Sequence, residues 1–264
     1  MTWLREKSLF IIASTILGIA MVLFLAVPLI GNLAGSATTI PEALSDTKTL
    51  NAIFTSFYCA LLATAFTFVL GIPFAYMFTR YEFSGKKILD SLIDLPILIP
   101  HNAAGIALLT VLGPHALIGG FLNSFGVQFI DNVLGIVVAM AFVSAPFMIR
   151  SAQEAFASVD PTMEKVARSL GASRFKVFLH VTIPLALRGI LMGCILTWAR
   201  SLSEFGAVVV LAYYPKTIPV YLYDVFSSEG LKAALPISGL LILLAIIVLV
   251  VFRLVTAKPA RLVH

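Results

Sequence analysis

Six long apolar stretches limit the fold of this chain more than any other feature of its sequence. A helix needs roughly 20 apolar residues to cross the hydrocarbon core of a bilayer, which is about 30 Å thick. The stretches that meet this requirement run over residues 9–30, 53–78, 88–112, 133–149, 185–211 and 233–254. Because lipid offers no hydrogen bonds to the backbone, such stretches cross it as helices. The sequence therefore predicts an all-α integral membrane protein with six transmembrane helices.

Composition points the same way. Charged residues make up 12% of the 264 residues and hydrophobic residues 60%, whereas roughly 25% of a soluble domain is charged. The first stretch follows Arg5 and Lys7 as a signal peptide would, but it exceeds the usual roughly 7–15 apolar residues, and we interpret it as a retained helix. The net charge of +5 is typical of loops beside a membrane and indicates no nucleic-acid partner.

The basic residues are divided unequally between the two sides that six crossings create. Of the 18 Lys and Arg residues, Lys48, Lys216 and Lys232 fall in loops on one side, and Arg200 falls inside a stretch. The others fall on the opposite side, which the positive-inside rule places in the cytoplasm. We expect a multi-pass protein of the cell membrane with both termini and the polar segment 153–184 in the cytoplasm.

This polar segment contains a short predicted helix. Asp160 is a suitable N-cap, and Pro161 follows at the first helical position, where its missing N–H costs nothing. Glu164 lies in the first turn and can pair with Arg168 one turn later. Gly171 supplies the left-handed residue that commonly ends a helix. These positions predict a helix over about 160–170.

The same helix carries an apolar stripe. Met163, Val166, Ala167 and Leu170 follow the spacing that places residues on one helical face. A helix of about ten residues is not stable alone in water. The stripe must therefore be covered, either by this chain or by another protein.

Polar chemistry enters the fifth stretch at Arg200 and Glu204, which are four residues apart and share a helical face with Gly193, Thr197 and Ser201. An uncompensated Arg near the centre of a span costs at least about 3 kcal/mol on insertion scales, so such residues normally mark a protein interior or an aqueous path. Two interpretations stay open: a functional site, or an ion pair that only fixes helix packing.

The third stretch contains Pro96 and Pro100, followed by His101 and Asn102. Each proline removes a backbone hydrogen bond, and broken helices near the midplane are a common way to build a substrate path. A lone His beside a kink is nevertheless more often a packing residue than a ligand. The connection over 115–130 is weakly apolar and either follows the outer interface or re-enters the membrane.

No catalytic or metal-binding constellation is found. The sequence contains no P-loop, HExxH or GxSxG motif. Cys59 and Cys194 lie inside apolar runs and are predicted to be core residues, and His115, His180 and His264 have no partners at metal-ligand spacing. We predict a conduit with no catalytic residue, metal or bound cofactor, whose energy source is another polypeptide.

The polar segment resembles the cytoplasmic loop of the membrane subunits of ATP-binding-cassette (ABC) importers. That loop reads Glu-Ala-Ala, three residues, Gly, nine residues, Ile-x-Leu-Pro. Here Gly171 is followed by nine residues and then by Val-Thr-Ile-Pro at 181–184. The first half departs from the pattern, because Lys165 and Val166 stand in place of the Glu and the first Ala, and Glu164 lies one residue early.

Three further segments narrow the resemblance. They are LPILIPHNAAGIALL (95–109), VSAPF (143–147) and ILTWARSLSEFGAVVVLAYYP (195–215). They are similar to the permease subunit of tungstate/molybdate importers, with molybdate and sulfate permeases next nearest. The resemblance covers about 49–254.

The resemblance implies a homodimeric type I ABC-importer permease fold. Residues 1–48 would form an N-terminal transmembrane helix and outer loop, 49–254 the permease core with its coupling loop 153–184, and 255–264 a cytoplasmic tail. The helix over 160–171 would dock on two ATPase subunits, which hold the ATP and Mg, and a substrate-binding protein would deliver the anion outside. The implied coupling residues are Asp160, Met163, Glu164, Val166, Ala167, Arg168, Leu170 and Gly171.

The pore at the dimer axis would be lined from the third and fifth stretches. Its candidate residues are Pro96, Pro100, His101, Asn102, Thr197, Arg200, Ser201, Ser203 and Glu204. Sulfate or another oxyanion is the alternative substrate. A channel without an ATPase and a membrane enzyme are the alternative functions.

Overall fold

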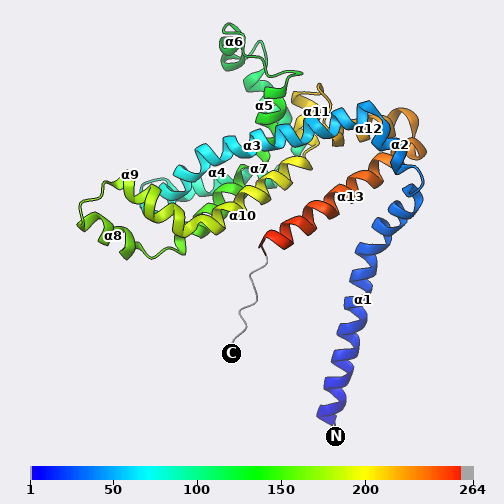
Figure 1. The fold of residues 1–264 in the computed structure, drawn as a ribbon, viewed down its shortest axis with the longest axis horizontal. Coiled ribbons are helices and arrows are strands. Elements are labelled where there is room, and N and C mark those ends of the chain that lie inside the picture. The colour runs from blue at the N-terminus through cyan, green and yellow to red at the C-terminus, as the bar shows by residue number, and fades with distance from the viewer. Residues whose placement is uncertain (1, 257–264) are drawn as a thin grey trace. The chain divides into compact units, whose positions relative to one another are not determined.

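The computed structural model describes residues 2–256, and within them every regular element is a helix. This confirms the predicted all-α class. The elements, shown in Figure 1, are α1 (Thr2–Ser36), α2 (Ile40–Ser45), α3 (Thr47–Arg80), α4 (Lys86–Leu98), α5 (His101–Leu112), α6 (Leu117–Asn123), α7 (Val133–Ala157), α8 (Pro161–Ser169), α9 (Arg174–Val177), the π-helix η1 (Phe178–Thr182), α10 (Ile183–Leu202), α11 (Gly206–Leu211), α12 (Ile218–Glu229) and α13 (Leu231–Thr256).

Five described segments are long and apolar enough to cross a membrane: Phe10–Ser36, Thr47–Arg80, Val133–Ala157, Arg174–Leu202 and Leu231–Val250. The third predicted stretch is instead two helices, α4 and α5, bent by 115° and countable as one broken span. The continuous helix expected over 185–211 is wrong, because α10 ends at Leu202 and α11 begins at Gly206. The first predicted stretch ends at residue 30, but α1 continues to Ser36, so the outer loop that follows it is shorter than expected.

The chain divides into two compact units. One comprises the described residues up to Leu50 and from Leu222 onward, and the other comprises Asn51–Tyr221. In the first unit α13 packs against α1 and α2, and the Asn32 amide donates to Ser238 Oγ at 3.0 Å. The apolar side chains of α1 between residues 10 and 30 are largely exposed, as expected of a helix that faces lipid.

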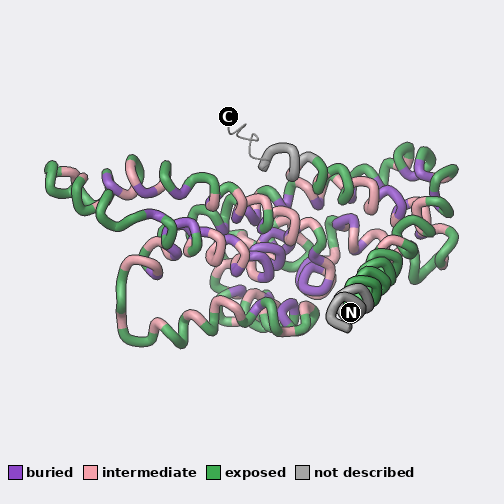
Figure 2. The backbone as a smooth tube through the Cα atoms, turned by 90° about the horizontal axis from the view of Figure 1, so that it is seen from below, coloured by how far each residue is buried: buried purple, intermediate pink, exposed green. Residues whose placement is uncertain are grey.

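In the second unit α7 packs against α4, α5, α10 and α11. Buried residues occur at regular intervals along the helices and leave the outer faces exposed (Figure 2). The core is rich in small side chains, including Ala60, Ala104, Ala139 and Ala207. Small residues let helix backbones approach closely, which is how helices associate when lipid supplies no hydrophobic drive.

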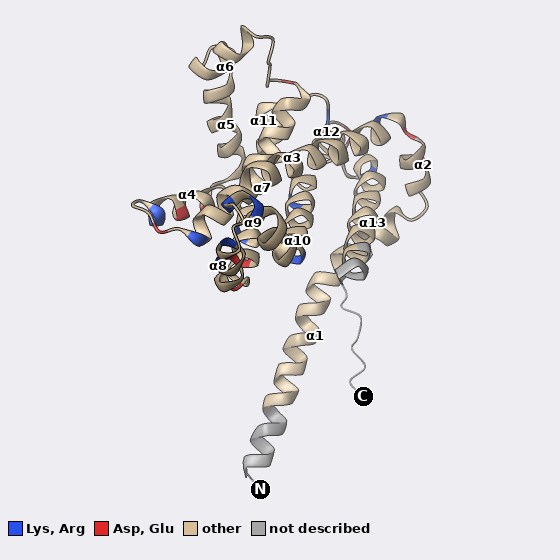
Figure 3. Cartoon of the chain, turned by 60° about the vertical axis from the view of Figure 1, so that its left-hand side comes forward, with Lys and Arg blue, Asp and Glu red and all other residues tan. Residues whose placement is uncertain are grey.

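The charged residues of this second unit gather at one end. Figure 3 shows Lys and Arg around α4, α8 and α9, whereas α5, α6 and α11 show almost none. The unit therefore has one basic end, which carries α8, and one apolar end, which carries α6.

Candidate functional sites

Two helix breaks meet inside the second unit. Pro100 lacks an N–H and disfavours helical geometry at Ile99, whose ψ is 144°, so α4 ends there and α5 starts anew at His101. The other break separates α10 from α11. The two breaks are adjacent: a Cβ on Gly206 would lie 2.5 Å from Asn102 Oδ1 and 2.7 Å from His101 Cβ. Glycine is required at residue 206 by this close approach.

An ionic cluster occupies this junction. Arg200 Nη2 donates to Glu204 Oε2 at 2.8 Å, so the expected ion pair is present. The other oxygen, Glu204 Oε1, accepts the N–H of Ala207 at 2.8 Å and thereby caps the start of α11. Glu204 is fully buried, whereas 19% of the Arg200 side chain is exposed. One carboxylate thus neutralises the arginine and holds the second helix break in place.

His101 is the third member of the cluster. It is a pore candidate from the sequence, together with Arg200 and Glu204, but the sequence predicts no contact of His101 with either of them. Its Nδ1 lies 3.2 Å from Glu204 Oε2, and both ring nitrogens lie 3.0 Å from Arg200 Nη2. The 38% exposed imidazole therefore joins the start of α5 to the end of α10. The proline break before His101 and the charged pair of Arg200 and Glu204 therefore belong to one site.

The remaining pore candidates fall into two groups. Asn102 and Ser203 are exposed beside the cluster, and Arg200 Nη1 donates to Ser203 Oγ at 3.3 Å. Thr197 and Ser201 are fully buried, and Ser201 Oγ donates to Ser144 Oγ of α7 at 3.0 Å. In α4, Pro96 is buried inside the helix without ending it, while Pro100 is exposed at the break. The exposed polar surface of the junction is therefore made by residues 101, 102, 200 and 203.

Tightening the junction should destabilise it. Gly206→Ala places a methyl group against α5, and such overpacking costs about 1–3 kcal/mol in unfolding free energy. We expect a lower thermal unfolding midpoint of the purified protein in detergent. The matched control is Gly18→Ala on α1, where nothing lies within 4 Å and alanine is the better helix former. Equal midpoints for the two variants would contradict the close contact of α5 and α11.

A second ionic cluster was missed from the sequence. The fourth predicted stretch ends at residue 149, just before Arg150, but α7 continues to Ala157 and contains this arginine. Its Nε and Nη2 bind the two oxygens of Asp94 at 2.9 and 2.6 Å, and its Nη1 binds Asp90 Oδ1 at 2.5 Å. Asp90 and Asp94 are four residues apart on α4, a spacing that could have indicated a shared partner. Together they fasten α4 to α7.

The helix α8 forms as predicted. Asp160 Oδ1 accepts the N–H of Thr162 at 2.8 Å, and this hydrogen bond lowers the pKa of the Asp160 carboxyl. Gly171 has φ +90° and ends the helix in the left-handed conformation. The capping residues therefore define this helix at both ends.

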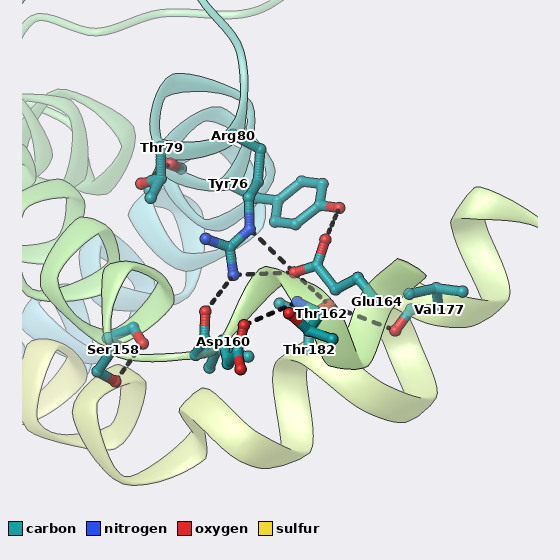
Figure 4. Close-up of polar contacts among 12 residues, drawn as sticks. Tyr76, Thr79, Arg80, Ser158, Asp160, Thr162, Glu164, Val177 and Thr182 are labelled. Carbon is teal, nitrogen blue, oxygen red and sulfur yellow. Dashed lines mark hydrogen bonds and ion pairs between the residues drawn. The ribbon is translucent and has the colours of Figure 1, made fainter. Parts of the chain in front are cut away.

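The apolar stripe of α8 is uncovered by the described chain. Met163 is 56% exposed, Val166 53% and Leu170 84%, while Ala167 is half-buried. The expected pairing of Glu164 with Arg168 is wrong, because Glu164 turns inward and pairs with Arg80 of α3 at 2.9 Å (Figure 4). The exposed surface of α8 thus includes the apolar stripe, while its inward side carries the acid.

Comparison with known proteins assigns this chain to a family of transport proteins. The model of the family described as "binding-protein-dependent transport system inner membrane component" matches residues 68–262. The chain belongs to this family. It is 37% identical to the molybdate/tungstate transport system permease protein of Thermococcus kodakarensis over 94% of this chain and 96% of that protein. It is also 39% identical to the molybdenum transport system permease protein of Escherichia coli, over 68% and 80%.

Solved structures show the same fold. A bacterial ABC transporter involved in import of the polysaccharide alginate matches with a TM-score of 0.72 and 20% identity, over 96% of both chains. A methionine ABC transporter in an inward-facing conformation matches with a TM-score of 0.61 and 14% identity, over 78% of this chain and 94% of that one. As a family member, the chain is a helical transport subunit of the membrane.

Proposed function

We propose that this chain is the permease subunit of an ATP-driven, binding-protein-dependent importer of tetrahedral oxyanions, chiefly tungstate and molybdate. The observation that supports the substrate class is the similarity to the molybdate/tungstate permease, which is 37% identical and aligns over nearly the full length of both chains. Both dianions accept hydrogen bonds, and the exposed surface of the junction offers donors of the required type from His101, Asn102, Arg200 and Ser203. The buried pairing of Glu204 with Arg200 removes a charge that would repel a dianion.

The proposed assembly is a homodimer with its pore at the axis. In each copy α4 and α5 together form one broken crossing, which brings the number of crossings from five to six. The two helix breaks would lie along the substrate path. Broken helices at the substrate path are a recurring arrangement in transporters. The basic end of the second unit, which carries α8, faces the cytoplasm in this proposal. Both termini are proposed to lie on the same side, because six crossings return the chain to the side on which it began.

The proposed energy source is a pair of ABC ATPase subunits that bind the ATP and Mg. The support is α8, whose exposed stripe of Met163, Val166 and Leu170 has the form of a helix that fits a groove of a partner. Contacts of Arg168 and the capping residues Asp160 and Gly171 would complete the rim. A soluble binding protein would deliver the anion on the outer side, and this chain itself performs no chemistry.

Uptake into proteoliposomes tests this function. The chain is reconstituted with a candidate ABC ATPase and a candidate binding protein from the same organism, and uptake of radiolabelled tungstate, molybdate and sulfate is measured with and without internal ATP and Mg. We expect ATP-dependent uptake of tungstate and molybdate, against which excess sulfate competes poorly. Equal uptake without ATP would instead indicate a channel, and preferred uptake of sulfate would indicate the alternative substrate.

A further inference from the structure

Besides packing against η1 and α9, α8 is attached to other described elements by the polar contacts of one side chain, Glu164. A nine-residue helix does not hold itself in place, and its stripe faces outward. The side chain of Glu164 points the other way and is 12% exposed, as is that of Arg80. Figure 4 shows this carboxylate between α3 and the segment that leads into α10.

Three side chains donate to the Glu164 carboxylate. Oε1 accepts from Arg80 Nε at 2.9 Å and from Thr182 Oγ1 at 3.1 Å, and Oε2 accepts from the Tyr76 hydroxyl at 3.1 Å. Arg80 Nη2 also donates to the carbonyl oxygen of Val159 at 2.9 Å, just before α8. Hydrogen bonds to an ionised group at a partly buried site are the strong ones. We call Glu164, Tyr76, Arg80 and Thr182 the Glu164 hub.

The hub reaches two membrane-spanning helices. Tyr76 and Arg80 lie in the last turns of α3. Thr182 is fully buried at the end of η1, which continues directly into α10. At its far end α10 carries Arg200, the cation of the junction. One carboxylate therefore bonds the exposed helix both to α3 and to the helix that ends at the proposed pore.

The position of the acid has a geometric consequence. Successive helical residues point about 100° apart, so Glu164 and Lys165 cannot face the same neighbour. Lys165 is exposed, and Glu164 is directed inward. The departure from the Glu-Ala-Ala pattern thus places a cation on the outer face of α8 and uses the acid to hold the helix from within.

We propose that Glu164 is a positioning residue, which fixes α8 to α3 and α10 so that a displacement of α8 moves both spans together. This inference rests on the proposed function, because the displacement would come from the docked ATPase. Without the hub, α8 stays joined to α10 through η1 but is free to move relative to α3. ATP hydrolysis would then continue while its movement no longer reaches the pore.

Glu164→Gln tests the proposal, because it removes the charge and keeps the shape. In the reconstituted complex we expect the ATPase to co-purify at the wild-type ratio, since the stripe is unchanged. The number of anions taken up per ATP hydrolysed should fall about tenfold, in line with the loss of a charge-assisted hydrogen-bond network. Glu154→Gln is the matched control, as it removes the same charge from an exposed position at the end of α7.

Two further variants separate positioning from docking and folding. Arg80→Gln should lower the uptake per ATP as Glu164→Gln does, and the double variant should be no worse than either alone, because the residues act as one unit. Tyr76→Phe removes one hydrogen bond of the hub and keeps the partly buried ring, so it should give a smaller loss even if the other variants fold poorly.

Two results would overturn the proposal. One is an unchanged uptake per ATP in Glu164→Gln and Tyr76→Phe. The other is loss of ATPase binding in Glu164→Gln, which would make the acid a docking residue. By contrast, failure of the wild-type chain to bind any ATPase would contradict the proposed function itself.

Discussion

Arg200→Met is expected to remove most of the stably folded protein. The substitution leaves the fully buried Glu204 carboxylate without its cation, and breaking one partner out of a buried pair costs about 3–5 kcal/mol. Since net protein stability is only about 5–15 kcal/mol, this loss is a large share of the total. The yield of monodisperse protein in detergent and its thermal unfolding midpoint measure the effect.

A double-mutant cycle assigns the loss to the pair. Glu204→Gln should be milder than Arg200→Met, because the amide oxygen still accepts the N–H of Ala207. The double variant should recover part of the lost midpoint, since it leaves no uncompensated charge. Arg188→Met provides the control: it removes an exposed arginine from the same helix. If Arg200→Met folds normally and supports normal anion uptake, the ion pair is needed neither for stability nor for transport.

Aspartate on the stripe of α8 is expected to abolish binding of the ATPase. Val166→Asp and Met163→Asp each place a charge where an apolar groove would close over it, and hot-spot residues of this kind cost about 2 kcal/mol or more. Affinity should fall at least about thirtyfold, given a tenfold change per 1.4 kcal/mol. Size-exclusion chromatography of the purified complex measures the fraction of permease that retains ATPase.

The control for this experiment lies on the same helix. Ser169→Asp adds the same charge at an exposed position outside the stripe. It should leave most of the complex intact. Release of the ATPase by Ser169→Asp to the same degree as by Val166→Asp would mean that charge, and not the apolar stripe, governs docking.

The features that the sequence predicts well are those set by local chemistry. Span length follows from the thickness of the bilayer, which gave most of the crossings. The cap at Asp160, the end at Gly171 and the pair of Arg200 with Glu204 involve residues at most four positions apart. Such relations join residues that are close in the sequence, so the residues themselves reveal them.

The features that the sequence did not predict depend on partners far along the chain or on competition between neighbouring groups. Arg168 lies one turn from Glu164, but Glu164 pairs with Arg80, 84 residues earlier, because the fold brings the end of α3 next to α8. The break after Leu202 runs through an apolar stretch in which hydrophobicity favours a continuous helix. It arises because the Glu204 carboxylate caps Ala207 and the close approach of Asn102 requires Gly206.

The uncovered stripe of α8 also bears on how a cell can make this protein. A subunit that displays Met163, Val166 and Leu170 to water carries an adhesive surface from the moment it enters the membrane. Such surfaces promote aggregation and attract proteolytic quality control until a partner covers them. Under the proposed function, we therefore expect the permease to accumulate only where the ATPase is synthesised in matching amounts.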